Sequence, residues 1–389
     1  MTSNVKLETI LSQGATTMKT HSFPMIALTL SFALLLILSG CEGPAGPAGK
    51  DAALPPFSLE GFAPGIACTD CHSADRDTTY YVAGRKYQWE QSKHATGGNS
   101  ERNGTSCAGC HTTEGFVERM NGQPVTNQYN PSPIGCFACH SPHARANFTL
   151  RDTTPVTITS NIVGVADAVF DYGRGNLCVK CHQTRTFSPK ATTTGDSIVI
   201  TTSRWYSHYG VQGQMLMGQG GFQFPGYTYT GNSNHTSNTA IRQEGCPICH
   251  MAEQAYPPGL GTGKAGGHTM NIGYEGEGGG ESFLLTGCNQ TGCHTSPAMS
   301  AATLQGVQDS VEHGLDSLYT LLLAQGWLDT TGSEPLVKLT GGKLVIRPAV
   351  KAGALYNWFF VKHDLSLGIH NTRYAYELLQ SSIEELQSN

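Results

Sequence analysis

The sequence contains few charged residues and no excess of basic ones. Lysine, arginine, aspartate and glutamate make up 14% of the 389 residues, whereas about 25% is typical of globular proteins. The 24 basic residues are outnumbered by 29 acidic ones, which gives a formal net charge of −5. Because nucleic-acid-binding domains carry clustered positive charge, we expect no nucleic-acid partner.

Long apolar segments are also scarce. The run MIALTLSFALLLILSGC, residues 25–41, has the length of a signal-peptide core and is short for a membrane span. Its last four residues, LSGC, resemble the bacterial lipobox. We therefore interpret residues 1–40 as a lipoprotein signal peptide that is cleaved before Cys41, whose thiol would be lipidated. A plain secretory signal that leaves Cys41 free is the alternative.

A lipidated Cys41 would make the chain an exported, membrane-anchored lipoprotein, since several acyl chains bind a bilayer stably where one does not. Glu42 is not the aspartate that retains bacterial lipoproteins at the inner membrane, so we expect the outer membrane, at its periplasmic or cell-surface face. We interpret residues 41–60 as a Gly/Pro tether between the lipid and the folded domain. Their two collagen-like triplets are too few to form a triple helix.

Cysteine, in contrast, is abundant and regularly placed. Five of the segments that contain the 13 cysteines have the form Cys-x-x-Cys-His, which is typical of covalent c-type haem attachment. The two thiols would bind the porphyrin vinyl groups, and the adjacent histidine would become the proximal iron ligand. The five motifs are Cys68/Cys71/His72, Cys107/Cys110/His111, Cys136/Cys139/His140, Cys178/Cys181/His182 and Cys246/Cys249/His250.

A sixth motif, TGCNQTGCHTSP at residues 286–297, has a longer loop between its cysteines. His294 still follows Cys293 directly, and Gly292 would let the chain bulge after Cys288. We interpret it as a sixth haem site, which uses 12 of the 13 cysteines and leaves Cys41. The alternative for this motif is a Cys288–Cys293 disulfide. For all the motifs together the alternatives are structural zinc sites or disulfides, but neither zinc nor a disulfide requires a histidine after every second cysteine. We expect six covalent haem c groups.

Enough histidines remain to supply a second ligand to each of six irons. His143 lies three residues after His140, so its ring should reach a neighbouring haem rather than its own. His313 and His363 are the expected bystanders, although His313 could replace one ligand. The predicted distal ligands are His94, His143, His208, His235, His268 and His370, and the competing methionines are Met215, Met217, Met251 and Met270.

The haem motifs follow no fixed repeat and all lie before residue 300. We predict a hexahaem domain at 61–300 and a C-terminal helical segment at 301–389 that packs on it and supplies His370. Helices are expected at 299–325 and 371–387, a strand or hairpin within 192–210, and a hairpin at 336–346. The predicted fold is mainly α with extensive loops and little β, a multihaem cytochrome c fold with a core of stacked haems.

The segment LSLGIHNTRYAYELL, residues 365–379, carries a family resemblance. It is similar to the G-x-H-N-P-x-Y-A segment of the multihaem superfamily that includes nitrite reductase and hydroxylamine oxidoreductase. The resemblance implies that His370 is a distal haem ligand. Thr372 stands where the family has proline. The chain as a whole resembles a multihaem cytochrome c lipoprotein.

The resemblance does not extend to the nitrite reductase active site, which has a motif ending in lysine, because all six motifs here end in histidine. We therefore expect an electron carrier, not an enzyme, in extracellular or periplasmic respiratory electron transfer, with redox partner proteins or an extracellular electron acceptor as its partners. The alternatives are a reductase of nitrite, hydroxylamine or sulfur oxyanions with one open haem, and a homo-oligomer or cytochrome filament in which His363 ligates a haem of the next subunit. A haem-bearing binding or sensor module is a further alternative, although the sequence has no recognisable partner domain for it.

Overall fold

The computed structural model describes residues 61–388, apart from 66, 98, 232–233, 254–262 and 277–278. The expected signal peptide, the tether and Cys41 lie outside these residues. All described residues belong to one compact unit, and the boundary expected at residue 300 stays a prediction. Within the described residues, no helix is both long enough and apolar enough to cross a bilayer.

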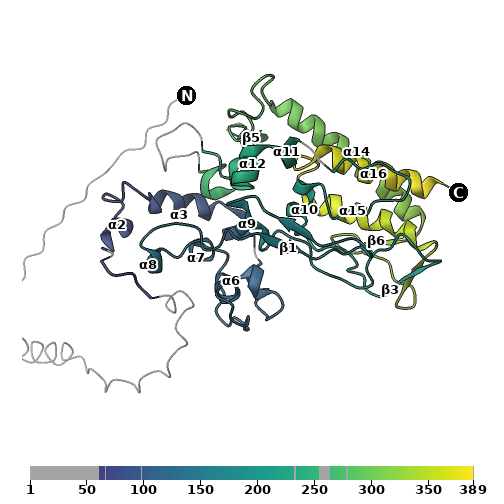
Figure 1. The fold of residues 1–389 in the computed structure, drawn as a ribbon, viewed down its shortest axis with the longest axis horizontal. Coiled ribbons are helices and arrows are strands. Elements are labelled where there is room, and N and C mark those ends of the chain that lie inside the picture. The colour runs from purple at the N-terminus through teal and green to yellow at the C-terminus, as the bar shows by residue number, and fades with distance from the viewer. Residues whose placement is uncertain are drawn as a thin grey trace, which may run out of the picture. The chain divides into compact units, whose positions relative to one another are not determined.

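The first two thirds of the described chain consists of short helices joined by loops (Figure 1). Helices of one turn are not stable alone in water, so these depend on what surrounds them. They are α2 (Thr69–His72), α3 (Val82–Glu90), α4 (Lys93–Thr96), α5 (Ala108–His111), α6 (Thr113–Met120), α7 (Cys136–Cys139), α8 (Pro142–Arg145), α9 (Gly175–Val179), α10 (Gln212–Met217), α11 (Asn234–Ser237), α12 (Thr239–Glu244), α13 (Pro247–His250) and the 3-10 turn η2 (Gly267–Thr269).

The strands described here are two or three residues long and form two-stranded antiparallel pairs. The pairs are β1 (Val156–Ile158) with β2 (Ala168–Phe170), β3 (Ile198–Ile200) with β8 (Leu344–Ile346), β4 (Gly273–Glu275) with β5 (Glu281–Phe283), and β6 (Leu328–Asp329) with β7 (Leu336–Val337). The prediction of a mainly helical chain with extensive loops and little sheet is confirmed, and β3 confirms the strand expected within 192–210.

Three longer helices, α14 (Ala301–Ala324), α15 (Ala352–Asp364) and α16 (Thr372–Gln387), pack against one another near the C-terminus (Figure 1). A 3-10 turn, η3 (Ala349–Lys351), precedes α15. The Ser300 hydroxyl caps α14 by accepting a hydrogen bond from the Thr303 N–H. The apolar residues that predicted α14 are buried at Leu304, Val311, Leu315, Leu318 and Leu322, so this helix and α16 are confirmed.

Helix α15 was not predicted from the sequence. Nearly every residue from Ala352 to Asp364 is buried, because the helix lies inside the main hydrophobic cluster and not at its surface. A helix buried on all sides has no polar face, so its sequence lacks the periodic pattern that marks an amphipathic helix.

The predicted hairpin at 336–346 is wrong in its pairing. Gly341 and Gly342 do turn the chain, and Thr340 and Lys343 form a single bridge. The two strands on either side separate after this bridge, since β7 pairs with β6 and β8 pairs with β3. The β3–β8 pair instead ties the C-terminal part of the chain to the residues before α10.

A buried polar network fixes α15 to α16 and to the loop before Phe222. The Asn357 Oδ1 accepts a hydrogen bond of 2.7 Å from the Phe222 N–H, and its Nδ2 donates to the Phe222 carbonyl at 2.8 Å and to the Ser382 hydroxyl at 3.0 Å. Gly353, one turn earlier, leaves no room for a Cβ beside the Phe222 ring. The network therefore orients the loop that leads from α10 to α11.

Asn357→Ala should lower the free energy of unfolding by about 1–3 kcal/mol, because it leaves the buried Phe222 N–H and carbonyl without partners. Denaturant unfolding followed by circular dichroism measures this loss. Gln380→Ala on the exposed face of α16 is the control, with an expected change within about 0.5 kcal/mol. Equal unfolding midpoints for the two variants would contradict the assigned network.

Candidate haem sites

All six cysteine-containing motifs share one backbone hydrogen bond. In each, the N–H of the histidine donates to the carbonyl of the first cysteine. We number the motifs as sites 1 to 6 in chain order. The bonds are His72 to Cys68 at 2.9 Å, His111 to Cys107 at 3.2 Å, His140 to Cys136 at 2.9 Å, His182 to Cys178 at 2.9 Å, His250 to Cys246 at 3.1 Å and His294 to Cys288 at 2.9 Å.

Site 6 keeps this bond although two more residues separate its cysteines. Gly292 has φ +85°, in the left-handed region that glycine adopts without strain. The longer loop therefore turns just before Cys293 and returns His294 to the position that the histidines of the other motifs occupy. The structure contains both cysteines as free thiols, so it contains no Cys288–Cys293 disulfide.

The second feature shared by the six sites is a facing histidine ring. Each motif histidine lies close to one histidine from another part of the chain, and the six partners are the six residues predicted as distal ligands. The ring centroids are separated by 6.3 Å for His72–His143, 6.2 Å for His111–His208, 6.4 Å for His140–His268, 6.1 Å for His182–His94, 6.1 Å for His250–His370 and 6.1 Å for His294–His235.

These separations fit one metal ion between each pair of rings. Metal ions of the first transition row bind imidazole nitrogen at about 2.0–2.1 Å. Two such bonds, extended to the centres of the rings, give a separation of about 6.4 Å. Two imidazoles in direct packing contact would have no reason to repeat one distance six times, so the residues present fit a haem held between two histidines.

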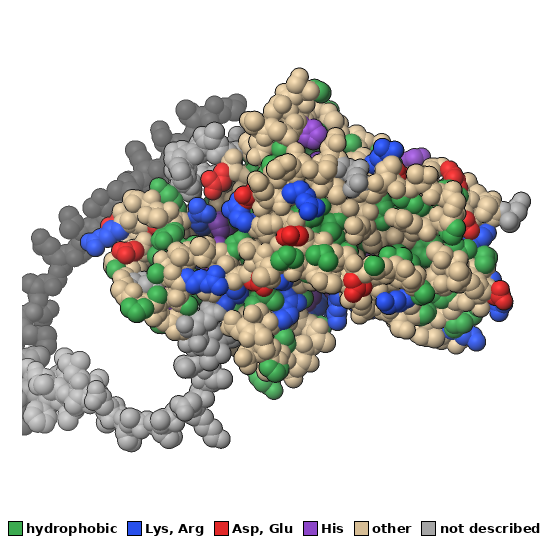
Figure 2. Space-filling view, in the orientation of Figure 1, with side chains coloured by type: hydrophobic (Ala, Val, Ile, Leu, Met, Phe, Trp, Pro, Cys, Tyr) green, Lys and Arg blue, Asp and Glu red, His purple; other side chains and the backbone are tan. Residues whose placement is uncertain are grey.

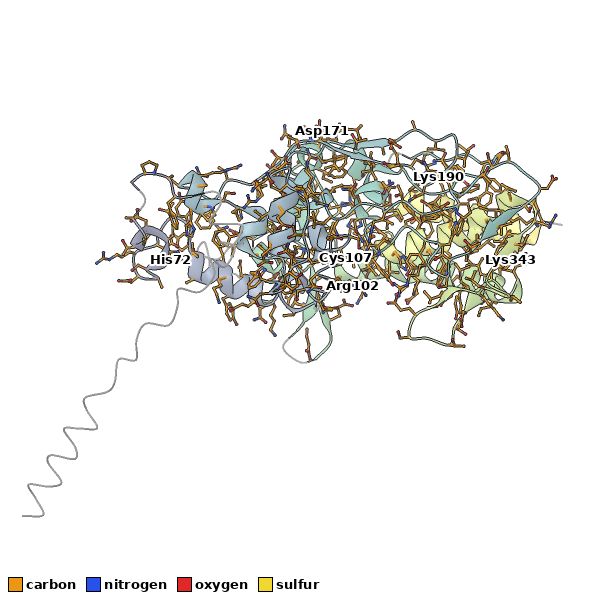
Figure 3. The ribbon with its side chains drawn as sticks, turned by 90° about the horizontal axis from the view of Figure 1, so that it is seen from below. His72, Arg102, Cys107, Asp171, Lys190 and Lys343 are labelled. Atoms are coloured by element: carbon orange, nitrogen blue, oxygen red, sulfur yellow. The ribbon has the colours of Figure 1, made fainter. Side chains whose placement is uncertain are left out.

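Five of the six sites line one large cavity. Its volume is 1930 Å³, whereas pockets for a single small molecule measure about 300–1,000 Å³. The histidine pairs of sites 2 to 6 all line it, and His72 and His143 of site 1 do not. Figure 3 places His72 at one end of the described chain, with Cys107 of site 2 nearer the middle and Lys343 toward the other end.

The six distal-type histidines come from short elements that local contacts hold in place. The Ser92 hydroxyl caps α4 by accepting from the Ala95 N–H, and η2 approaches α3 closely because Gly267 has no side chain to meet Gln88. His94 lies on α4, His143 on α8, His235 on α11 and His268 on η2, while His208 and His370 lie in the loops before α10 and α16.

Hydrogen bonds at Nδ1 orient five of the paired rings. An oxygen acceptor at Nδ1 requires a proton there, which leaves the Nε2 lone pair available to a metal. The acceptors are the Thr149 carbonyl for His140 at 3.4 Å, Gln212 Oε1 for His182 at 3.2 Å, the His370 carbonyl for His235 at 3.3 Å, the Met270 carbonyl for His250 at 3.0 Å and Asp364 Oδ1 for His370 at 2.7 Å.

The electrostatic surroundings keep most of these rings neutral. Burial, with a smaller contribution from neighbouring histidines and arginines, lowers the pKa of His94, His208, His250 and His268 to about 4. Burial likewise lowers the pKa values of His111, His140, His182 and His235. Metal ligation needs a neutral imidazole, so these rings are prepared for it at pH 7.

His370 differs from the others. Burial alone would lower the pKa of His370, but the Asp364 carboxylate outweighs it and raises the pKa. Asn371, the next residue, caps α16 by accepting from the Tyr374 N–H. Thr372 is the first residue of that helix. Proline is favoured at the first position of a helix, where an N–H would have no partner within the helix, and threonine occupies that position here.

The histidines expected to be bystanders form no histidine pair within the described residues. His313 is exposed on α14. His363 is only 5% exposed and packs against the rings of Tyr206, Tyr209 and Phe359. Among the competing methionines, Met215 and Met217 are buried in hydrophobic clusters, and Met251 and Met270 line the cavity.

An arginine that sequence reasoning did not single out joins sites 2 and 4. Arg119 Nη1 lies 3.1 Å from Cys110 Sγ, and Nη2 lies 3.7 Å from Cys181 Sγ and donates to the Lys180 carbonyl at 2.9 Å. The sequence near Arg119 does not distinguish it from the other arginines of the chain. Its role depends on contacts with two cysteines, Cys110 and Cys181, that belong to separate motifs.

Glycines allow the chains of sites 4, 5 and 6 to pack closely against one another. A Cβ on Gly175, at the start of the helix that carries Cys178, would lie 2.8 Å from the Cα of Gly245 and 2.9 Å from the backbone nitrogen of Cys246. A Cβ on Gly287, before site 6, would lie 2.9 Å from the Cα of Cys249. Any larger residue at these positions would push neighbouring motifs apart.

Comparison with known proteins agrees with the cysteine motifs. Two curated proteins, both named C-type polyheme cytochrome OmcB and from two strains of Geobacter sulfurreducens, are 25% identical to this chain over 174 residues. The match covers 42% of this chain and 20% of each relative, so it spans about a fifth of their length. This similarity supports a multihaem c-type cytochrome.

A solved structure, that of outer cell wall cytochrome OcwA, aligns with 78% of this chain and 50% of its own, at 18% identity and a TM-score of 0.48. No protein-family model matches the chain. The resemblance of residues 365–379 to the nitrite reductase superfamily stays a prediction.

Gly175→Ala should destabilise the protein, because the added methyl group overlaps the chain of site 5 and overpacking costs about 1–3 kcal/mol. Gly306→Ala is the matched control, since nothing lies within 4 Å of a Cβ there and helix propensity favours alanine by about 0.5–1 kcal/mol. Denaturant unfolding should move in opposite directions for the two variants. A Gly175→Ala protein as stable as the wild type would contradict the close packing of sites 4 and 5.

Proposed function

We propose that this chain is an electron-transfer protein that holds six covalent haem c groups, each between two histidines. The observation that carries the proposal is the set of six ring pairs, each joining one motif histidine to one histidine from elsewhere at 6.1–6.4 Å. When bound, haem c supplies a reversible one-electron change at iron. The chain supplies spacing, ligands and burial.

Ligation by two histidines favours a carrier over an enzyme. A reductase of nitrite, hydroxylamine or sulfur oxyanions needs one iron with an open position for its substrate. Here each of the six motif histidines has a second histidine ring opposite to it, including His294 in the unusual site 6. No motif ends in lysine.

Contacts between motifs connect all six sites. Site 1 joins site 3 through the turn that holds His140 and His143. Site 3 joins site 4 because Cys139 and Cys181 pack on the same small apolar cluster. Arg119 joins site 4 to site 2, and the glycine contacts join site 4 to site 5 and site 5 to site 6. Sites 2 and 3 also meet, because the Gly135 N–H donates to the Thr113 hydroxyl, and sites 3 and 5 meet where the Met270 carbonyl beside η2 accepts from His250. In this set of contacts, site 1 reaches the others through site 3, and site 6 reaches them through site 5.

Six connected sites suit a protein that passes electrons from one partner to another. We propose redox proteins or an extracellular electron acceptor as those partners. On the face shown in Figure 2, basic and acidic side chains are interspersed, with no continuous region of one sign. Export and anchoring through Cys41 rest on the apolar run at residues 25–41, and the outer membrane is the proposed location. A filament linked through His363 is disfavoured because that ring is buried.

His208→Ala should produce one high-spin ferric haem, because it removes the second ligand proposed for site 2. His363→Ala is the matched control. Both rings lie beside Tyr209, at centroid distances of 5.3 and 4.3 Å, and burial lowers both pKa values to about 4. Electron paramagnetic resonance of the purified ferric proteins distinguishes the two.

Added imidazole should restore the low-spin signal of His208→Ala, because it can occupy the vacated position. A high-spin signal in His363→Ala and none in His208→Ala would show that the ligand at site 2 is misassigned. A high-spin signal already present in the wild type would favour the reductase instead.

A further inference from the structure

The imidazole of His370 donates a hydrogen bond to a buried carboxylate. Asp364 Oδ1 accepts the His370 Nδ1 hydrogen bond at 2.7 Å, and the Asp364 residue is only 2% exposed. Asp364 Oδ2 accepts from the Ser366 hydroxyl, whose oxygen in turn accepts from the His370 backbone N–H at 3.2 Å. Both carboxylate oxygens are therefore committed to the segment that presents His370 to His250.

No other paired histidine in the described part of the chain has a carboxylate at its ring nitrogen. Those with a recorded Nδ1 acceptor have a carbonyl or amide oxygen, and the buried Nδ1 atoms of His143 and His268 have no partner. His250, on the opposite side of site 5, itself bonds the Met270 carbonyl. Site 5 thus combines one neutral acceptor with one full negative charge.

We propose, resting on the function proposed above, that Asp364 is a positioning residue that makes site 5 the most reducing of the six haem sites. A carboxylate that accepts the Nδ1 proton makes the imidazole a stronger donor to iron at Nε2. Stronger donation and a buried negative charge both favour the oxidised state over the reduced one. Water screens a charge that is this buried less than it screens a charge at the surface.

The position of site 5 gives this tuning a consequence for electron flow. Site 5 contacts site 4 at Gly175 and site 6 at Gly287. With haems bound at these sites, an electron that moves between sites 4 and 6 would pass through site 5, where its reduction is least favourable. Asp364 would therefore slow exchange with site 6 relative to exchange among sites 1 to 4.

A purely structural role for Asp364 is the competing explanation. The turn from Asp364 to His370 contains two leucines in the left-handed region, Leu365 at φ +60° and Leu367 at φ +48°. Such residues persist only where surrounding contacts hold them, and the Asp364–Ser366–His370 bonds are such contacts. The two roles separate experimentally, because asparagine removes the charge, retains an acceptor oxygen at Oδ1 for His370 and can donate from Nδ2 to the Ser366 hydroxyl in place of the bond that Asp364 Oδ2 accepts.

The test is a potentiometric titration of the holoprotein, followed by haem absorbance and by electron paramagnetic resonance, for the wild type and Asp364→Asn. We expect the lowest of the six midpoint potentials to move upward in Asp364→Asn and the other five to stay in place. The g values of one low-spin species should change with it. Asp364→Glu, which keeps the charge, should leave the lowest midpoint potential close to its wild-type value.

Asp329→Asn is the matched control, since it makes the same chemical change at a half-buried carboxylate at the end of β6, which accepts hydrogen bonds from Thr331. It should leave all six midpoints unchanged. Six low-spin haems with identical midpoints in wild type and Asp364→Asn would overturn the inference and leave the proposed function standing. A high-spin site in the wild type would instead contradict the proposed function itself.

Discussion

The fold depends on bringing twelve imidazoles together in six pairs whose members are far apart in the sequence. His250 meets His370, and His140 meets His268, so loops from one part of the chain must cross another. Most elements that carry these rings are single helical turns, which have no stability of their own. The histidine pairs, together with any cofactor bound between the two rings, therefore fix the positions of these short helices. This explains why all six pairs have a similar ring separation although the surrounding elements differ from site to site.

A second constraint follows from the first. If cofactors occupy the space between the rings, the motifs must approach one another without bulky side chains in the way. Gly175, Gly245 and Gly287 make this possible at sites 4 to 6, where a Cβ on each would overlap the neighbouring chain. Between sites 2 and 4 the connection is a side chain, because Arg119 contacts a cysteine sulfur atom of each motif. The C-terminal helices form a conventional apolar core beside the haem sites. The loop between α15 and α16 places His370 opposite His250.

The sequence was informative where a residue's role depends on its immediate neighbours. The cysteine spacing identified all six motifs, and the apolar period of α14 identified the helix and the side that faces the core. It was less informative where the partner is distant. Helix α15 has no polar face to mark it, and the strands around Gly341 pair with other segments rather than with each other. Which histidine faces which motif also depends on tertiary structure alone. Asp364 and Arg119 were missed because neither belongs to a motif.

The most direct test of the account is the ferric electron paramagnetic resonance spectrum of the wild-type holoprotein, with haem quantified per chain. The account predicts six haems, all low-spin, because every iron would have two imidazole ligands. Five haems would show that the chain at Cys288–His294 does not attach a cofactor. A high-spin signal of about one haem equivalent would contradict the assignment of twelve histidines as ligands and would point to an open, catalytic iron.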